Sequence, residues 1–228
     1  YELHVGRELS RTCLGGGVSM AIHESQSRFY ENIIGRSRAF CGVIYPWLRE
    51  HFAPRLDDVS PEDFYRMINK AQPSLIRTEA DELTYCLHIM VRYELERRMF
   101  AGELTAHDLP AQWNRLYKAY LGVDVPNDRE GILQDSHWAN GNIGYFPSYA
   151  IGSAYGAQYL RQMQKDFDVS AAVATGRLTQ INRWLEEKIW KYGCMKDPTP
   201  LFESVCGPFD PTCYTAYLRD KFTEVYGL

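Results

Sequence analysis

The feature that most constrains the fold of this chain is a helical spacing of apolar residues, which recurs along most of its length. In residues 19–40, apolar side chains recur at Ile22, Phe29, Ile33 and Phe40, which places them on one face of a helix. Alternation of apolar and polar residues, the pattern of a half-buried strand, is almost absent. The sequence therefore predicts an all-α, multi-helix protein.

Prolines, glycines and capping residues divide the chain into its expected helices. A first long helix should run from residue 19 to about Tyr45 and be kinked or ended by Pro46. Ser60-Pro61-Glu62-Asp63 has the pattern of a helix start. Later helices are expected over 78–100, with a buried face of Leu83, Leu87, Met90, Val91 and Leu95, over 108–121, through the small residues 152–157, over 179–192, and from 210 onward.

Residues 1–18 have no convincing period and carry three consecutive glycines, so we expect a connecting segment with a short strand or two. The length allows one domain or two. The net charge of −4, without a Lys/Arg run, argues against nucleic acid as a partner. No apolar stretch approaches the ~18 residues of a membrane span. The six cysteines lack C-x-x-C spacing, which favours reduced thiols in a cytoplasmic protein.

A second, polar stripe runs along the 19–40 helix at the same period and includes Glu24, Arg28, Glu31 and Gly35. Carboxylates and a glycine on one line indicate a helix that packs closely against something and points acids at it. The alternative is a solvated face with i,i+4 pairing, such as Glu24 with Arg28.

Three short motifs occur in order along the chain: His23-Glu24-Ser25-Gln26-Ser27-Arg28, Ile76-Arg77-Thr78-Glu79-Ala80-Asp81, and Gly131-Ile132-Leu133-Gln134-Asp135-Ser136-His137-Trp138. Together they resemble the signatures of the carboxypeptidase Taq family of helical, zinc-type metallocarboxypeptidases. The H-E-x-x-H motif of that family does not occur in these residues. The resemblance implies that residues 1–228 are the C-terminal helical part of such an enzyme and form one side of a peptidase cleft, with residues 1–18 following the zinc-binding helix.

The resemblance implies that Glu24 is the third protein ligand of a zinc ion, whose other ligands are the histidines of H-E-x-x-H. His23 points about 100° away from Glu24 around the helix, and it is expected to contact the ligand residues or to pack against the helix rather than to bind the metal. Gln26 and Ser27 could hydrogen-bond Glu24 or a ligand histidine. The alternative for Glu24 is a surface pair with Arg28.

Arg77 is implied to bind the C-terminal carboxylate of the substrate, since a guanidinium can hold a carboxylate through two hydrogen bonds. The alternative is a structural pair with Asp81 or Glu79. Asp81 itself is interpreted as a capping residue or as the group that orients Arg77.

The third motif implies catalytic and substrate-binding roles in one loop. His137 could stabilise a tetrahedral intermediate or shuttle a proton. Gln134 and Asp135 are implied to bind the substrate. Asp135 could orient His137 only if the loop turns. Tyr145 and Tyr149 are candidate phenol donors, and helix packing is their alternative role.

For the parent enzyme the resemblance implies removal of C-terminal residues from peptides by water activated on zinc or another divalent metal. Residues 1–228 alone are expected to bind no metal and to be inactive. One side of a cleft on its own leaves a concave, partly apolar surface exposed. We expect a second copy of the chain to cover this surface, which predicts a homodimer. The alternative function is a non-catalytic helical scaffold or interaction module.

Overall fold

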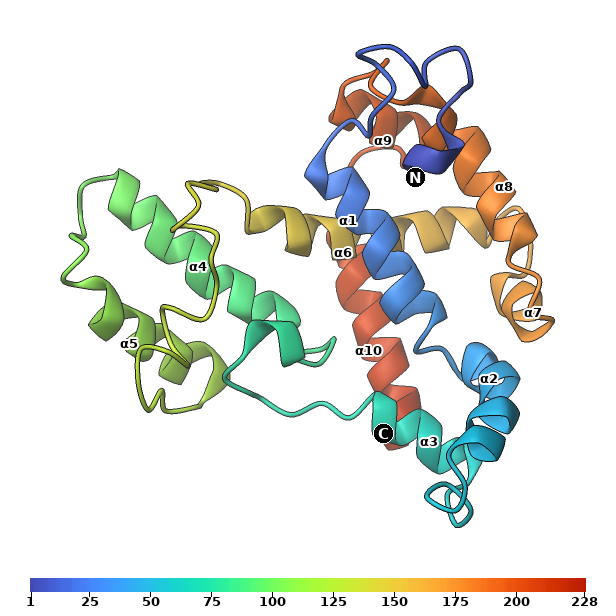
Figure 1. Ribbon diagram of the computed structural model, residues 1–228, viewed down its shortest axis with the longest axis horizontal. Helices are drawn as coiled ribbons and strands as arrows, with labels where there is room; N and C mark the ends of the chain where they lie inside the picture. The colour runs from blue at the N-terminus through green and yellow to red at the C-terminus, as the bar shows by residue number, and fades with distance from the viewer. The chain divides into compact units, whose positions relative to one another are not determined.

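The computed structural model describes all residues from Tyr1 to Leu228 and contains helices but no strand (Figure 1). The chain divides into two compact units. Unit 1 comprises Tyr1–Asn69 and Ile151–Leu228, and unit 2 comprises Lys70–Ala150. The predicted all-α class is confirmed.

Unit 1 contains most of the helices. In chain order they are η1 (Glu2–His4), α1 (Met20–Arg28), the π-helix η2 (Phe29–Ile34), α2 (Arg38–His51), α3 (Pro61–Ile68), α6 (Pro147–Met163, of which the first turn belongs to unit 2), α7 (Val169–Ala174), α8 (Thr179–Lys188), η4 (Trp190–Tyr192), α9 (Pro198–Cys206) and α10 (Thr212–Tyr226).

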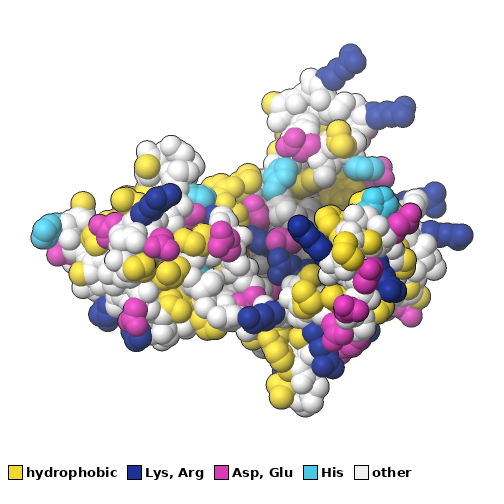
Figure 2. Space-filling view, turned by 60° about the horizontal axis from the view of Figure 1, so that its bottom comes forward, with side chains coloured by type: hydrophobic (Ala, Val, Ile, Leu, Met, Phe, Trp, Pro, Cys, Tyr) yellow, Lys and Arg dark blue, Asp and Glu magenta, His cyan; other side chains and the backbone are white.

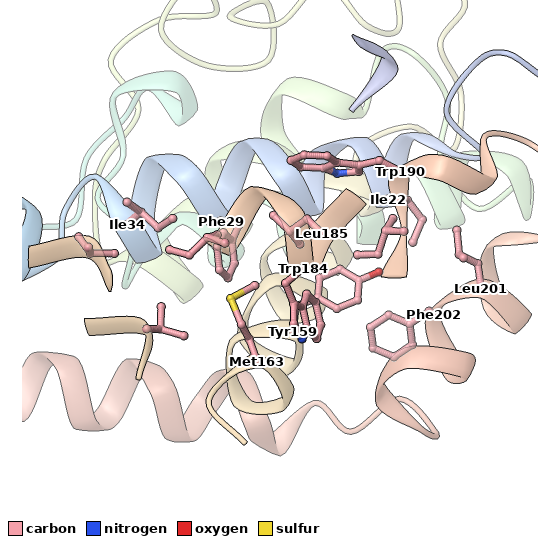
Figure 3. Packing of buried hydrophobic residues seen from close by; sticks show 14 residues of the cluster. Ile22, Phe29, Ile34, Tyr159, Met163, Trp184, Leu185, Trp190, Leu201 and Phe202 are labelled. Atoms are coloured by element: carbon pink, nitrogen blue, oxygen red, sulfur yellow. The ribbon is translucent and has the colours of Figure 1, made fainter. Parts of the chain in front are cut away.

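The core of unit 1 is formed by the apolar face of α1 and η2 (Figure 3). Ile22 and Phe29 are fully buried there, as the spacing of the sequence predicts. They meet side chains from α6, α8 and α9, among them Tyr159, Leu185 and Phe202. This burial holds the polar stripe of α1 in a defined orientation.

Unit 2 is built on a helix pair, α4 (Tyr85–Phe100) and α5 (Leu109–Leu121), preceded by the short η3 (Arg77–Glu79). Its core consists of Val91, Leu95, Trp113, Leu116, Tyr117 and Leu121. The helix expected over 108–121 is confirmed in α5, which ends at Gly122, a residue in the left-handed conformation that glycine tolerates best (φ 72°).

The expected strand near the N-terminus is wrong. After η1, residues 5–18 form successive turns whose hydrogen bonds are local, such as Leu9 N–H to Gly6 O and Thr12 N–H to Leu9 O. A strand needs a partner strand for its backbone groups, and this segment satisfies many of them in its own turns instead, with further bonds from Gly6 N–H to Lys191 O and from Cys194 N–H to Leu14 O.

The single helix expected from residue 19 to Tyr45 is also wrong. The chain leaves the α-helical pattern at Phe29, and Gly35 N–H bonds Tyr30 O in the i→i+5 pattern of a π-helix. Ser37 then caps a new helix, α2, by accepting from Phe40 N–H. Pro46 lies inside α2 because the carbonyl that it leaves without a partner, that of exposed Gly42, can face water.

The helix expected over 78–100 begins later, at Tyr85. The turn before it is closed by Asp81, whose carboxylate accepts from Thr84 N–H and Thr84 Oγ1. The expected buried face is only partly right: Val91 and Leu95 are buried, whereas Leu83 and Met90 are exposed. Polar side chains, described below, take the buried positions of this helix instead.

None of the helices combines the length and the apolar composition that crossing a lipid bilayer requires. On the face of the surface shown in Figure 2, basic and acidic side chains are interspersed. All six cysteines are free thiols.

Candidate active-site residues

Glu24 lies on α1 and is largely buried, with 17% of its side chain exposed. Its Oε2 accepts a hydrogen bond from Ser27 Oγ (2.9 Å) and lies 3.9 Å from Arg28 Nε. The expected support by Ser27 is therefore present, and so is the ion pair with Arg28. Because Arg28 also bonds Glu31 Oε2 at 2.8 Å, it is shared between two carboxylates.

Glu24 is held in place by α6. Gly152 packs directly against the backbone of Glu24 and Ser25, so closely that a side chain on Gly152 would overlap them. The small residues of α6 thus allow the close approach of another helix.

The other two residues expected to support Glu24 point away from it. Gln26 Oε1 accepts from Trp190 Nε1 (2.9 Å), and Gln26 Nε2 donates to Ser25 Oγ (2.8 Å), so Gln26 does not bond Glu24, and its alternative bond to a ligand histidine stays a prediction. The His23 ring packs 5.0 Å from the ring of Tyr1, and its Nε2 lies 3.7 Å from Glu2 Oε1.

No group of three or more His, Cys, Asp or Glu side chains in the chain is arranged to hold a metal ion. A catalytic zinc takes three protein ligands. The residues of this chain therefore do not by themselves fit a zinc site, although the carboxylate of Glu24 has the chemistry of one ligand.

Arg77 lies at the start of η3 and is buried, with 6% exposure. Its Nη2 donates to Asp135 Oδ1 (2.7 Å), and its Nε is shared between the two oxygens of Asp135 (3.1 and 3.2 Å). Its Nη1 donates to Tyr85 Oη at 2.8 Å. The alternative of a structural pair with Asp81 or Glu79 is wrong, since the partner of Arg77 comes from a loop 58 residues away.

Asp135 also binds a second arginine, Arg92, at the centre of α4. Arg92 Nε donates to Asp135 Oδ2 (2.7 Å), and Arg92 Nη2 lies 2.6 Å from the same oxygen. We call Arg77, Asp135 and Arg92 the arginine–aspartate cluster. Burial alone would raise the pKa of Asp135, but the hydrogen bonds and charges of the two guanidinium groups outweigh it, and the pKa is lowered.

Gln134 connects the cluster to the backbone. Its Oε1 accepts from Arg77 N–H (2.9 Å) and Arg92 Nη2 (2.8 Å), and its Nε2 donates to Leu75 O and Glu130 O, both at 3.0 Å. With its donors and acceptor occupied, Gln134 holds the loop against Arg77 and Arg92. The expected contact with substrate is not available to it without breaking these bonds.

His137 lies beside the cluster with 14% of its side chain exposed. Its Nε2 is 3.0 Å from Tyr149 Oη, and its ring is 5.4 Å from the ring of Tyr145. Its Nδ1 is buried without a hydrogen-bond partner and lies 3.8 Å from Asp135 Oδ1, too far for the orienting bond considered from the sequence. Burial lowers the pKa of His137, and the nearby charge of Asp135 opposes that effect only in part.

Tyr149 links His137 to Arg77, because the Arg77 guanidinium lies 4.7 Å from the centre of the Tyr149 ring. Arg77, Asp135, His137, Tyr145 and Tyr149 therefore form one polar and aromatic group within unit 2. Glu24 belongs to unit 1, and a common site with this group stays a prediction.

Sequence reasoning missed Arg92, which has no solvent exposure, together with its buried neighbours His88 and Tyr117. Arg92 Nη1 donates to His88 O (2.7 Å) and to Tyr117 Oη (3.2 Å). The available signal was an arginine between Val91 and Leu95, at a core position of an otherwise apolar helical period. A charge at such a position requires a buried partner.

Comparison with known proteins identifies the family of the chain. The family model of the carboxypeptidase Taq (M32) metallopeptidases matches residues 1–222. The chain is 44% identical to carboxypeptidase 1 of Bacillus subtilis, and the match covers 99% of this chain and 46% of that protein. It is 43% identical to thermostable carboxypeptidase 1 of Pyrococcus furiosus, and the match covers 97% of this chain and 45% of that protein.

The structure superimposes on solved relatives over nearly its whole length. It matches the M32 carboxypeptidase of Deinococcus radiodurans R1 with a TM-score of 0.96 at 41% identity, covering 100% of this chain and 46% of that one. It matches a Pyrococcus furiosus carboxypeptidase with a TM-score of 0.94 at 43% identity, covering 97% of this chain and 45% of that one. The chain, which spans about half the length of these relatives, belongs to the carboxypeptidase Taq (M32) metallopeptidase family.

Proposed function

We propose that this chain contributes the substrate-carboxylate site of a metallocarboxypeptidase that acts on peptides with a free C-terminus. The observation that carries the proposal is the hydrogen bonding of Arg77. A guanidinium has five N–H groups, and the bonds to Asp135 and Tyr85 use one on Nε, one on Nη1 and one on Nη2. One N–H group remains on each terminal nitrogen, enough to hold the two oxygens of a carboxylate.

The charge of the site supports the same role. The arginine–aspartate cluster brings two guanidinium groups onto one carboxylate, which leaves an excess of one positive charge. An excess charge with little access to water is stabilised by an anion. The carboxylate of a peptide C-terminus supplies such an anion, and an internal peptide group does not.

The remaining roles follow from the family and from the chemistry of the side chains. Glu24 is proposed as one ligand of a divalent metal, which when bound would activate water for hydrolysis of the peptide bond. His137 and Tyr149 are proposed to face the reacting peptide group next to the Arg77 site. Because the chain does not itself assemble three metal ligands, we expect it to have no carboxypeptidase activity alone.

Binding of a minimal C-terminal group tests the proposal without requiring activity. N-acetyl-L-phenylalanine and N-acetyl-L-phenylalaninamide differ only in the carboxylate, and each would be titrated into the chain while its amide signals are followed by NMR. We expect the carboxylate to bind more tightly than the amide. Arg77→Met should remove the difference, since a lost charge-assisted bidentate contact costs on the order of 2 kcal/mol or roughly thirtyfold in affinity.

Arg115→Met is the matched control, because Arg115 is an exposed arginine of the same unit that bonds only Gln112. It should bind the two compounds as the unmodified chain does. Equal affinity of the unmodified chain for the carboxylate and the amide would refute the Arg77 role and favour the alternative of a helical scaffold.

A further inference from the structure

Arg92 cannot touch a substrate because it has no solvent exposure, yet its guanidinium makes several hydrogen bonds inside unit 2. It is fully buried, and its hydrogen bonds to Asp135, His88 O, Tyr117 and Gln134 use four of its five N–H groups, while its Nη2 also lies 2.6 Å from Asp135 Oδ2. Its guanidinium also lies 4.6 Å from the centre of the Trp113 ring. Such a group is costly to bury, so its position calls for a physical reason.

The reason lies in the charge of Asp135. Alone, the pair of Arg77 and Asp135 would be neutral, because the carboxylate would cancel the charge that has to attract a substrate carboxylate. The two oxygens of Asp135 divide their strongest bonds between the arginines: Oδ1 takes Arg77 Nη2 at 2.7 Å, and Oδ2 takes Arg92 Nε at 2.7 Å. Asp135 can thus orient Arg77 while its charge is compensated from behind.

We propose that Arg92 is a positioning residue for the carboxylate site: by neutralising Asp135, it leaves the positive charge of Arg77 available to the substrate. This inference rests on the proposed function of Arg77. It assigns the charge balance of the site to a side chain that substrate never reaches. Asp135 therefore orients Arg77, and Arg92 compensates the charge of Asp135 so that the cluster stays positive.

The test is a set of variants that change the net charge of the arginine–aspartate cluster by known steps. Arg92→Gln lowers it from +1 to 0, and the affinity for N-acetyl-L-phenylalanine should fall roughly tenfold, the size expected for one partly screened unit charge at this range. Affinity for the corresponding amide should not change. The double variant Arg92→Gln/Asp135→Asn returns the charge to +1 and should recover most of the carboxylate preference.

If Arg92 has a merely structural role, the double variant should bind the carboxylate more weakly than Arg92→Gln does. Removing a second buried partner would then weaken binding further, and a double variant that binds the carboxylate no better than Arg92→Gln overturns the inference. If Arg92→Gln does not fold, Arg92→Lys decides, because it keeps the charge and loses the planar fork. Binding within about threefold of the unmodified chain supports the inference, and a tenfold loss refutes it.

The same titrations separate this inference from the proposed function. If the unmodified chain does not prefer the carboxylate to the amide, the Arg77 role fails and the Arg92 inference fails with it. If the unmodified chain shows the preference and Arg92→Gln retains it in full, only the Arg92 inference is refuted.

Discussion

Two glycines one turn apart on α6 meet α1 at different distances, and this difference makes a sharp test of the helix packing that holds Glu24. A Cβ on Gly152 would stand 2.6 Å from Glu24 Cβ, 2.8 Å from Glu24 C and 2.9 Å from Ser25 N. A Cβ on Gly156 would stand 3.4 Å from Ser25 O and 3.6 Å from Ile33 Cδ1, which are ordinary contacts.

The magnitudes follow from these distances. Replacing a glycine inside a helix by alanine stabilises the helix by about 1 kcal/mol, and this gain applies to both positions. Overpacking costs typically about 1–3 kcal/mol, and the upper end applies at Gly152 because two of the three overlapping atoms are backbone. Gly152→Ala should therefore lower the free energy of unfolding by about 2 kcal/mol, and Gly156→Ala should raise it by up to about 1 kcal/mol.

Urea unfolding followed by far-UV circular dichroism would measure both variants against the unmodified chain. Helix propensity is nearly the same at the two positions, so the difference between the variants, about 3 kcal/mol, reports the helix–helix contact alone. If both substitutions change stability in the same direction and by similar amounts, the close contact between α6 and α1 is not present in solution.

Two further predictions concern protonation and metal. Burial, together with the charges of Arg92 and Arg77, lowers the pKa of His88 to about 4, below the value of about 6.5 for an exposed histidine. As the pH falls from about 6.5 to 4, the unfolded chain binds this proton first, so the free energy of unfolding should decrease by on the order of 3 kcal/mol. His88→Gln should flatten this part of the profile of unfolding free energy against pH. A profile that the substitution leaves unchanged would contradict the assignment to His88. Metal analysis of the purified chain should show no stoichiometric zinc and peptide assays no turnover, whereas tight one-to-one zinc with turnover would show that three ligands do assemble.

Much of the architecture was accessible from the sequence because it depends on local chemistry. The apolar spacing of Ile22 and Phe29 predicted the buried face of α1, and Ser60-Pro61-Glu62-Asp63 predicted the start of α3. The short motifs also identified the family. Each of these signals lies within a few residues of chain, where periodicity, capping and motif recognition apply.

The pairing of side chains distant in the chain could be decided only by the tertiary structure. From the sequence, Arg77 had its nearest carboxylates in Glu79 and Asp81, but folding brings Asp135 to it from 58 residues away. Asp135 in turn appeared as a partner for His137, two residues along, yet it bonds two arginines instead. A buried guanidinium takes the partner that the packed core presents, and that choice depends on how α4 and the 131–138 loop meet, which no local pattern encodes.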